Sequence, residues 1–79
     1  MTVNVLFFGA TADLVGKREL DVSHHEGVKV SHVVSDLVGQ FPGLRDHRLL
    51  YSVNLSYVVD DTVLHDGDEI AVFTAVSGG

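Results

Sequence analysis

The residues with the clearest potential for chemistry are the last three, Ser77, Gly78 and Gly79. Two successive glycines give a backbone without side chains, which can enter a channel where any Cβ atom would clash. With glycine near 7% of residues, a given pair of positions is glycine–glycine only about 0.5% of the time. The reactive group that such an end presents is the α-carboxylate of Gly79. The sequence therefore predicts a chain end that carries this carboxylate into another protein, and an idle frayed tail is the alternative.

Ala75 and Val76 join this end to an apolar run that predicts the final strand, residues 69–75. Fully extended, the last five residues span roughly 17 Å. We expect residues 74–79 to form a flexible tail, in which Ala75, Val76 and Ser77 are the stem that passes through a partner's channel and Gly78 provides clearance.

The five histidines could suggest a metal site. His24 and His25 are adjacent, so on an extended chain their side chains point in opposite directions. The remaining three (His32, His47 and His65) lack the spacing of a helical zinc motif. The pattern favours structural or surface roles, and we expect no metal site.

Two acidic stretches, residues 60–61 and 66–69, contain carboxylates but do not match a calcium-binding loop. Aspartate and glycine at these positions are typical of turns. The sequence also lacks a G-x-S-x-G nucleophile motif and a phosphate-binding loop. We therefore predict no active site and no tightly bound cofactor in this chain, apart from its terminal carboxylate.

The 79 residues suffice for one small domain, residues 1–79, and they include no cysteine, which excludes disulfides and thiolate chemistry. A net charge of −6 argues against nucleic-acid binding, which depends on lysine and arginine. No apolar run approaches the roughly 20 residues of a membrane span, and the start lacks the pattern of a signal peptide. We expect a cytoplasmic protein that binds neither nucleic acid nor membrane.

The elements that position the chain end follow from periodicity. Residues 3–8, 17–22, 49–54 and 69–75 predict strands, with a turn at residues 55–56. The segment 9–16, bounded by glycines, predicts one or two helical turns with Thr11 as the N-cap and Gly16 as the terminator. A longer helix that stops before residues 42–43 is predicted by one apolar stripe: Val30, Val33, Val34, Leu37, Val38 and Phe41. This order predicts an α+β domain of the β-grasp type, a mixed sheet packed on one main helix.

Alternation along the first strand places Val3, Val5 and Phe7 on one face, and Leu6 and Phe8 on the other. In a β-grasp sheet the first and last strands are neighbours. We therefore predict that Leu6, Phe8 and Phe73 form a docking patch, since exposed apolar patches often mark interfaces. A partly buried core position is an equally weighted alternative for Phe73.

Across nearly its whole length the chain resembles the small subunits of molybdopterin synthase, ubiquitin-like β-grasp sulfur carriers of the MoaD/ThiS family, which includes the thiamine-pathway carrier. The resemblance rests on five segments: VLFFGATADLVG, the helix ending in QFP, VNLSYVV, LHDGDEIAVF and the terminal VSGG. The spacing from DGDE to the final GG is its most specific part. The family usually has two prolines where this chain has Thr74 and Ala75.

The resemblance implies a carrier cycle. A ubiquitin-activating-like enzyme would use ATP to adenylate the carboxylate of Gly79, and a sulfur donor would convert the adenylate to a thiocarboxylate. The large subunit of molybdopterin synthase would then accept the sulfur for the dithiolene of molybdopterin. Two alternatives stay open: a sulfur carrier for the thiamine thiazole or another metabolite, and a ubiquitin-like modifier or interaction module.

Overall fold

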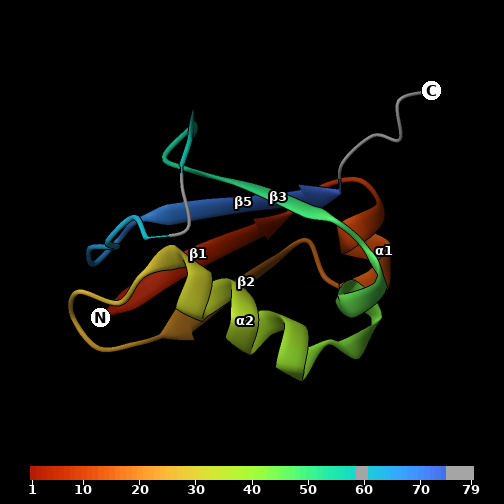
Figure 1. Cartoon of the computed structure of the whole chain (residues 1–79), viewed down its shortest axis with the longest axis horizontal. Helices are drawn as coiled ribbons and strands as arrows, with labels where there is room; N and C mark the ends of the chain where they lie inside the picture. Colours follow the sequence, from red (N-terminus) through yellow and green to blue (C-terminus); the bar gives the residue numbers. More distant parts are fainter. Residues whose placement is uncertain (59–60, 75–79) are drawn as a thin grey trace.

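The computed structural model describes residues 1–58 and 61–74. A five-stranded sheet lies with one face against the main helix, α2, and a short helix, α1, lies at one end of the sheet (Figure 1). The elements follow in the order β1 (Thr2–Phe7), α1 (Ala10–Val15), β2 (Glu19–Ser23), α2 (Val30–Gln40), the 3-10 helix η1 (Pro42–Asp46), β3 (Leu49–Val53), β4 (Ser56–Tyr57) and β5 (Glu69–Thr74).

The strands lie in the order β2-β1-β5-β3-β4. The central pair, β1 and β5, is parallel, with Val5 opposite Ile70 and Phe7 opposite Val72. The other pairs are antiparallel. The predicted α+β class, the mixed sheet on one main helix and the adjacency of the first and last strands are therefore confirmed.

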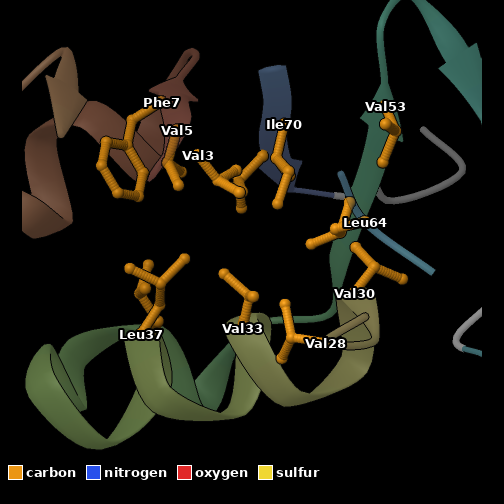
Figure 2. Close-up of a cluster of buried hydrophobic side chains, with 12 residues drawn as sticks. Val3, Val5, Phe7, Val28, Val30, Val33, Leu37, Val53, Leu64 and Ile70 are labelled. Atoms are coloured by element: carbon orange, nitrogen blue, oxygen red, sulfur yellow. The ribbon is translucent and has the colours of Figure 1, made fainter. Parts of the chain in front are cut away.

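The core lies between the sheet and α2 (Figure 2). From the helix, Val33 and Leu37 point toward the side chains of β1 and β5, as the apolar stripe predicted. Val3 and Val5 are fully buried, and the ring of Phe7 meets that of Phe41 edge to face at 6.3 Å. Each fully buried side chain of this size contributes about 1.5–3 kcal/mol through the hydrophobic effect. Because valine is a mediocre helix former, α2 depends on this packing.

The helix α2 begins after Lys29, whose side chain makes no capping hydrogen bond. It ends at Gln40, before Pro42, as predicted. Pro42 then begins η1, where the missing N–H of proline costs nothing at a helix start. The 3-10 helix η1 buries Leu44, a residue that the sequence pattern did not assign to the core.

The predicted role of Thr11 as an N-cap is wrong. The residue before α1 is Gly9, with φ of 58°, and Thr11 lies inside the helix and is fully buried. Its Oγ1 lies 2.6 Å from the carbonyl oxygen of Phe8 and 2.9 Å from that of Val72. The hydroxyl proton can be donated to only one of these oxygens at a time. Thr11 therefore ties α1 to the ends of both central strands. The predicted terminator, Gly16, is confirmed as a left-handed C-cap.

We expect Thr11→Val to lower the free energy of unfolding by about 1–3 kcal/mol, because it removes a buried hydroxyl hydrogen bond while keeping the shape of the side chain. The control Thr11→Ser keeps the hydroxyl and should retain the hydrogen bond. Urea unfolding followed by circular dichroism measures both variants. A Thr11→Val protein as stable as the parent would show that the hydroxyl does not hold α1 in place.

The turn between β3 and β4 is displaced by one residue from the prediction at residues 55–56. It is formed by Asn54 and Leu55, which have φ of 49° and 71°, and Ser56 already belongs to β4. Positive φ at both positions is the geometry of a type I′ hairpin turn. Asn54 tolerates it well, and its amide group bonds Asp68 and the backbone of Glu69. These bonds fix the hairpin to the start of β5.

Candidate functional site

The sheet face that points away from α2 carries the predicted docking residues. In the parallel β1–β5 pair, Leu6 lies opposite Ala71 on this face, while their neighbours Phe7 and Val72 point into the core. Beyond the end of β1, the backbone N–H of Phe8 donates to the carbonyl oxygen of Val72 at 3.0 Å. The Phe8 side chain is 51% exposed. The structure therefore places Leu6 and Phe8 on the side expected from strand alternation.

Phe73 also lies on this open face rather than in the core. Its neighbour Val72 is fully buried, and alternation along β5 turns Phe73 to the opposite side. Phe73 is opposite Leu50 of β3, and its ring lies 5.9 Å from that of Tyr57, edge to face. Phe73 was predicted to lie either in a surface docking patch or in a partly buried core position, and the structure places it on the surface.

Two further residues of this face were not predicted: Leu50, which is 36% exposed, and Tyr57, which is 78% exposed. Alternation along residues 49–53 could have identified Leu50, because Leu49, Tyr51 and Val53 face the other side. Tyr57 could be assigned to this face only once the order of the strands was known. We call the following set the open-face patch: Leu6, Phe8, Leu50, Tyr57, Ala71 and Phe73. It draws on four strands, and contiguous apolar surface of this kind typically marks an interface.

A hollow of about 460 Å³ adjoins the patch where β1 ends. It shares Leu6 and Phe8 with the open-face patch. Its charged boundary residues are Asp13 of α1, Glu19 of β2 and Arg18, which directly precedes β2. An apolar floor with a charged rim suits an apolar side chain of a partner that is flanked by polar contacts. The hollow extends the candidate interface toward α1.

The predicted tail begins beside this surface. Thr74, which we assigned to the tail, is the last residue of β5 and pairs with Leu49. The other tail positions, Ala75, Val76, Ser77, Gly78 and Gly79, lie outside the described residues. Because β5 lies between β1 and β3, its last two residues, Phe73 and Thr74, are in the middle of the sheet. A protein that covers the open-face patch is therefore close to the start of the tail.

Comparison with known proteins identifies the family. Residues 5–79 match the ThiS family. The chain belongs to the ThiS family. It is 40% identical to the molybdopterin synthase sulfur carrier subunit of Mycobacterium tuberculosis (strain ATCC 25618 / H37Rv), over 98% of this chain and 96% of that relative.

Two solved structures place the fold of this ThiS-family chain. SAMP1 from Haloferax volcanii superposes with a TM-score of 0.86 at 26% identity, and the match covers 100% of both chains. The complex of subunits 1 and 2 of the molybdopterin-converting factor from Helicobacter pylori 26695 contains a chain that matches with a TM-score of 0.71 and 22% identity, again over 100% of both chains. At that identity the second likeness supports the fold alone. The predicted β-grasp fold is confirmed.

Acidic residues of this ThiS-family chain surround the turn before β5. Asp66 Oδ1 accepts a hydrogen bond from the backbone N–H of Thr2 at 2.8 Å, and Asp68 Oδ2 accepts one from that of His65 at 2.8 Å. Gly67 between them has φ of 84°, which favours glycine. The Asp68 carboxylate therefore bonds the backbone of its own turn, as the sequence interpretation predicted, whereas the Asp66 carboxylate joins the turn to β1.

The pKa of Asp68 is lower than that of an ordinary aspartate. Partial burial acts to raise this pKa, but the hydrogen bonds from Asn54 Nδ2 and the His65 backbone, together with the charge of His65, outweigh it. A folded-state pKa below the unfolded value adds stability at pH values above the unfolded pKa, near 3.9. That stability is lost as the pH falls through the folded pKa.

We expect Asp68→Asn to lower the free energy of unfolding by about 1 kcal/mol at pH 7, the typical net value of a hydrogen bond. The variant should also lose less stability than the parent between pH 5 and the acid limit, roughly pH 2. Thermal unfolding across this range measures both effects. Asp46→Asn, at an exposed aspartate of η1, is the control. If the Asp68→Asn variant lost as much stability at low pH as the parent, the lowered pKa of Asp68 would not be the cause of that loss.

The histidines form a cluster that their sequence positions did not predict. The ring of His32 on α2 lies 5.9 Å from that of His24 and 6.4 Å from that of His25. The Nε2 atoms of His24 and His32 lie 3.6 Å and 3.8 Å from Asp36 Oδ2. The i,i+4 spacing of His32 and Asp36 could have indicated part of this cluster. Among the residues that the structure describes, no group of three or more such side chains has an arrangement that could hold a metal ion.

No helix within residues 1–58 and 61–74 has the length and apolar character needed to cross a membrane.

Proposed function

We propose that this chain is the sulfur carrier subunit of a molybdopterin synthase in the cytoplasm. The observation that carries the proposal is the near full-length match, at 40% identity, to the M. tuberculosis protein of that name. The β-grasp fold and the open-face patch beside the start of the tail are consistent with it. In this role the chain supplies the sulfur atom, and a large subunit supplies the catalytic side chains.

The proposed chemistry takes place at Gly79. A carboxylate resists nucleophiles because its charge is delocalised and oxide is a poor leaving group. An adenylating partner of the ubiquitin-activating type transfers AMP from ATP to the carboxylate, which releases pyrophosphate. A hydrosulfide equivalent from a sulfur donor then forms the C–S bond, and AMP leaves with the electrons of the broken C–O bond. The product is a thiocarboxylate, a good sulfur nucleophile.

The residues before Gly79 have positioning roles in this proposal. Gly78 allows the backbone to pass through a narrow channel, and Ala75, Val76 and Ser77 form the stem within it. The open-face patch binds the large subunit so that the tail starts at the entrance of that channel. Fixing the carrier body in this way raises the effective concentration of the thiocarboxylate at the acceptor.

The experiment that tests the proposal uses the full chain with its adenylating enzyme, ATP and sulfide. We expect the intact mass to rise by the difference between one sulfur and one oxygen atom, and deletion of Gly79 to abolish this change. Addition of the large subunit and the cyclic pyranopterin precursor should then yield molybdopterin and return the carrier to its original mass. A carrier that gains no sulfur would contradict the proposal.

A second function, attachment to lysines as a protein modifier, is favoured by the likeness to SAMP1 of H. volcanii, which a second solved structure names small archaeal modifier protein 1. It uses the same adenylate but transfers the Gly79 acyl group to an amine. Isopeptide adducts in extracts that contain ATP would support it. Rescue of a strain that lacks the molybdopterin carrier, without rescue of a thiamine-carrier strain, would support the first function over both alternatives.

A further inference from the structure

Within residues 1–58 and 61–74, the strand β2 (Glu19–Ser23) lies at one edge of the sheet and pairs only with β1. Edge strands present a row of backbone N–H and C=O groups that another chain can use. Five residues are long enough to pair with a short extended peptide. The question is which of these groups point outward and what surrounds them.

Hydrogen bonds at the two ends of β2 give the orientation of its backbone. At one end, the carbonyl oxygen of Arg18 accepts from the N–H of Phe7 at 2.8 Å. At the other end, the N–H of His24 donates to the carbonyl oxygen of Met1 at 3.0 Å, and the terminal amine of Met1 donates to the carbonyl oxygen of His24 at 2.8 Å. Arg18 and His24 therefore direct their backbone groups toward β1. Because this direction alternates along an antiparallel strand, the residues whose groups point away from β1 are Glu19, Asp21 and Ser23.

A groove of about 340 Å³ separates this edge from α2. Its apolar walls come from Leu20 and Val22 on β2 and from Val33 and Leu37 on the helix. Leu20 and Val22 pair with the buried residues Val5 and Val3 and point to the same side of the sheet, but they are only half-buried. The helix thus leaves part of the core side open at this edge, next to the outward backbone groups.

The opposite side of β2 is acidic. Asn4 Nδ2 donates to Asp21 Oδ1 at 2.9 Å and lies 3.5 Å from Glu19 Oε1, so both carboxylates lie on the open face of the sheet. Asp36 adds a further carboxylate at the groove, 55% exposed, beside His24. The edge therefore combines free backbone groups, an apolar groove on one side and negative charge on the other.

We propose that β2 binds an extended segment of another protein in which apolar and basic residues alternate. The segment adds a strand to the sheet through the backbone of Glu19, Asp21 and Ser23. Successive side chains of a strand point to opposite sides, so its apolar residues enter the groove and its lysines or arginines lie beside Glu19 and Asp21. The proposal does not depend on sulfur transfer, since it uses neither the tail nor Phe73.

A second copy of this chain fits the same edge poorly. Antiparallel pairing of β2 with β2 would bring the carboxylates of Glu19 and Asp21 close to those of the other copy, and like charges opposite each other are destabilising in sheets. The overall charge of −6 adds to this repulsion. Charge complementarity thus selects a basic peptide.

The test uses the full chain, labelled with ¹⁵N, and a capped peptide of alternating lysine and valine. We expect the backbone amides of Asp21 and Ser23 to exchange with solvent more slowly when the peptide is bound. The amides of Leu20 and Val22, which already face β1, should not change. Affinity should fall as salt is added. Slowed exchange without this alternation, or shifts confined to the open-face patch, would overturn the proposal.

Matched controls separate the backbone and charge contributions. A peptide with glutamate in place of lysine should not bind, and one that is N-methylated at the amides facing β2 should bind at least about tenfold more weakly. In the protein, Asp21→Pro removes an outward N–H, whereas Asp21→Asn keeps it and removes only the charge. If Asp21→Pro fails to fold, the N-methylated peptide still tests whether binding depends on backbone hydrogen bonds to β2. Protection that rises with protein concentration in the absence of peptide would instead indicate a second copy and overturn the proposal.

Discussion

Gly78→Val abolishes sulfur delivery while the domain stays folded: this is the result with the largest expected effect. A valine side chain at residue 78 adds bulk next to the reacting carbonyl, where a channel shaped for glycine has no room for it. Misplacement of a reacting group by about 1 Å can cost on the order of a hundredfold in rate. Because residue 78 lies beyond the last described strand, β5, we expect the free energy of unfolding to change by less than about 0.5 kcal/mol.

The measurement has two stages, thiocarboxylate formation by intact mass and molybdopterin formation with the large subunit. The control Gly78→Ala adds a single Cβ and should retain partial activity, which would rank the two variants by side-chain size. Deletion of Gly79 should abolish both stages, because the new terminal carboxylate, on Gly78, lies about 3.4 Å short of the position that the adenylating enzyme requires. Normal sulfur transfer by the Gly78→Val protein would show that no narrow channel surrounds this part of the tail.

Phe73→Ser should weaken binding to the large subunit by about 30- to 1,000-fold, which corresponds to the 2–4 kcal/mol typical of a buried aromatic residue at the centre of an interface. Phe73 contacts Tyr57 and lies opposite Leu50, so it occupies the middle of the open-face patch. Since Phe73 is outside the core, the variant should lose no more than about 1 kcal/mol of stability.

Calorimetric titration of the purified large subunit measures this effect. Val63→Ser is the matched control, because Val63 is 44% exposed but lies outside the open-face patch, at a bridge with Lys29. It should bind like the parent. Equal affinities of the Phe73→Ser and parent proteins would place the interface on another surface, even if the carrier function were correct.

Much of the fold followed from local patterns. The apolar stripe predicted α2 within a residue of its observed ends, and alternation predicted which side of β1 faces the core. For Phe73 of β5 the sequence left the core and the surface equally open, and the structure has it on the surface. Local propensity failed where tertiary contacts decide. Thr11 has the chemistry of an N-cap, yet its hydroxyl bonds Phe8 and Val72 instead, and residue 72 is remote in sequence. The hairpin turn also moved by one residue, because the Asn54 side chain bonds residues 68 and 69.

By itself, the sequence determined which residue types are available for chemistry: it has no cysteine, a net charge of −6, and glycine at both residue 78 and residue 79. Residue type fixes such properties wherever the chain folds. Only the tertiary structure decided which side chains meet, since strand order brings together residues far apart in the chain. It assembled the open-face patch by placing Tyr57 and Leu50 beside Phe73. It also brought His24 and His32 near Asp36, and left the β2 edge and its groove open beside α2.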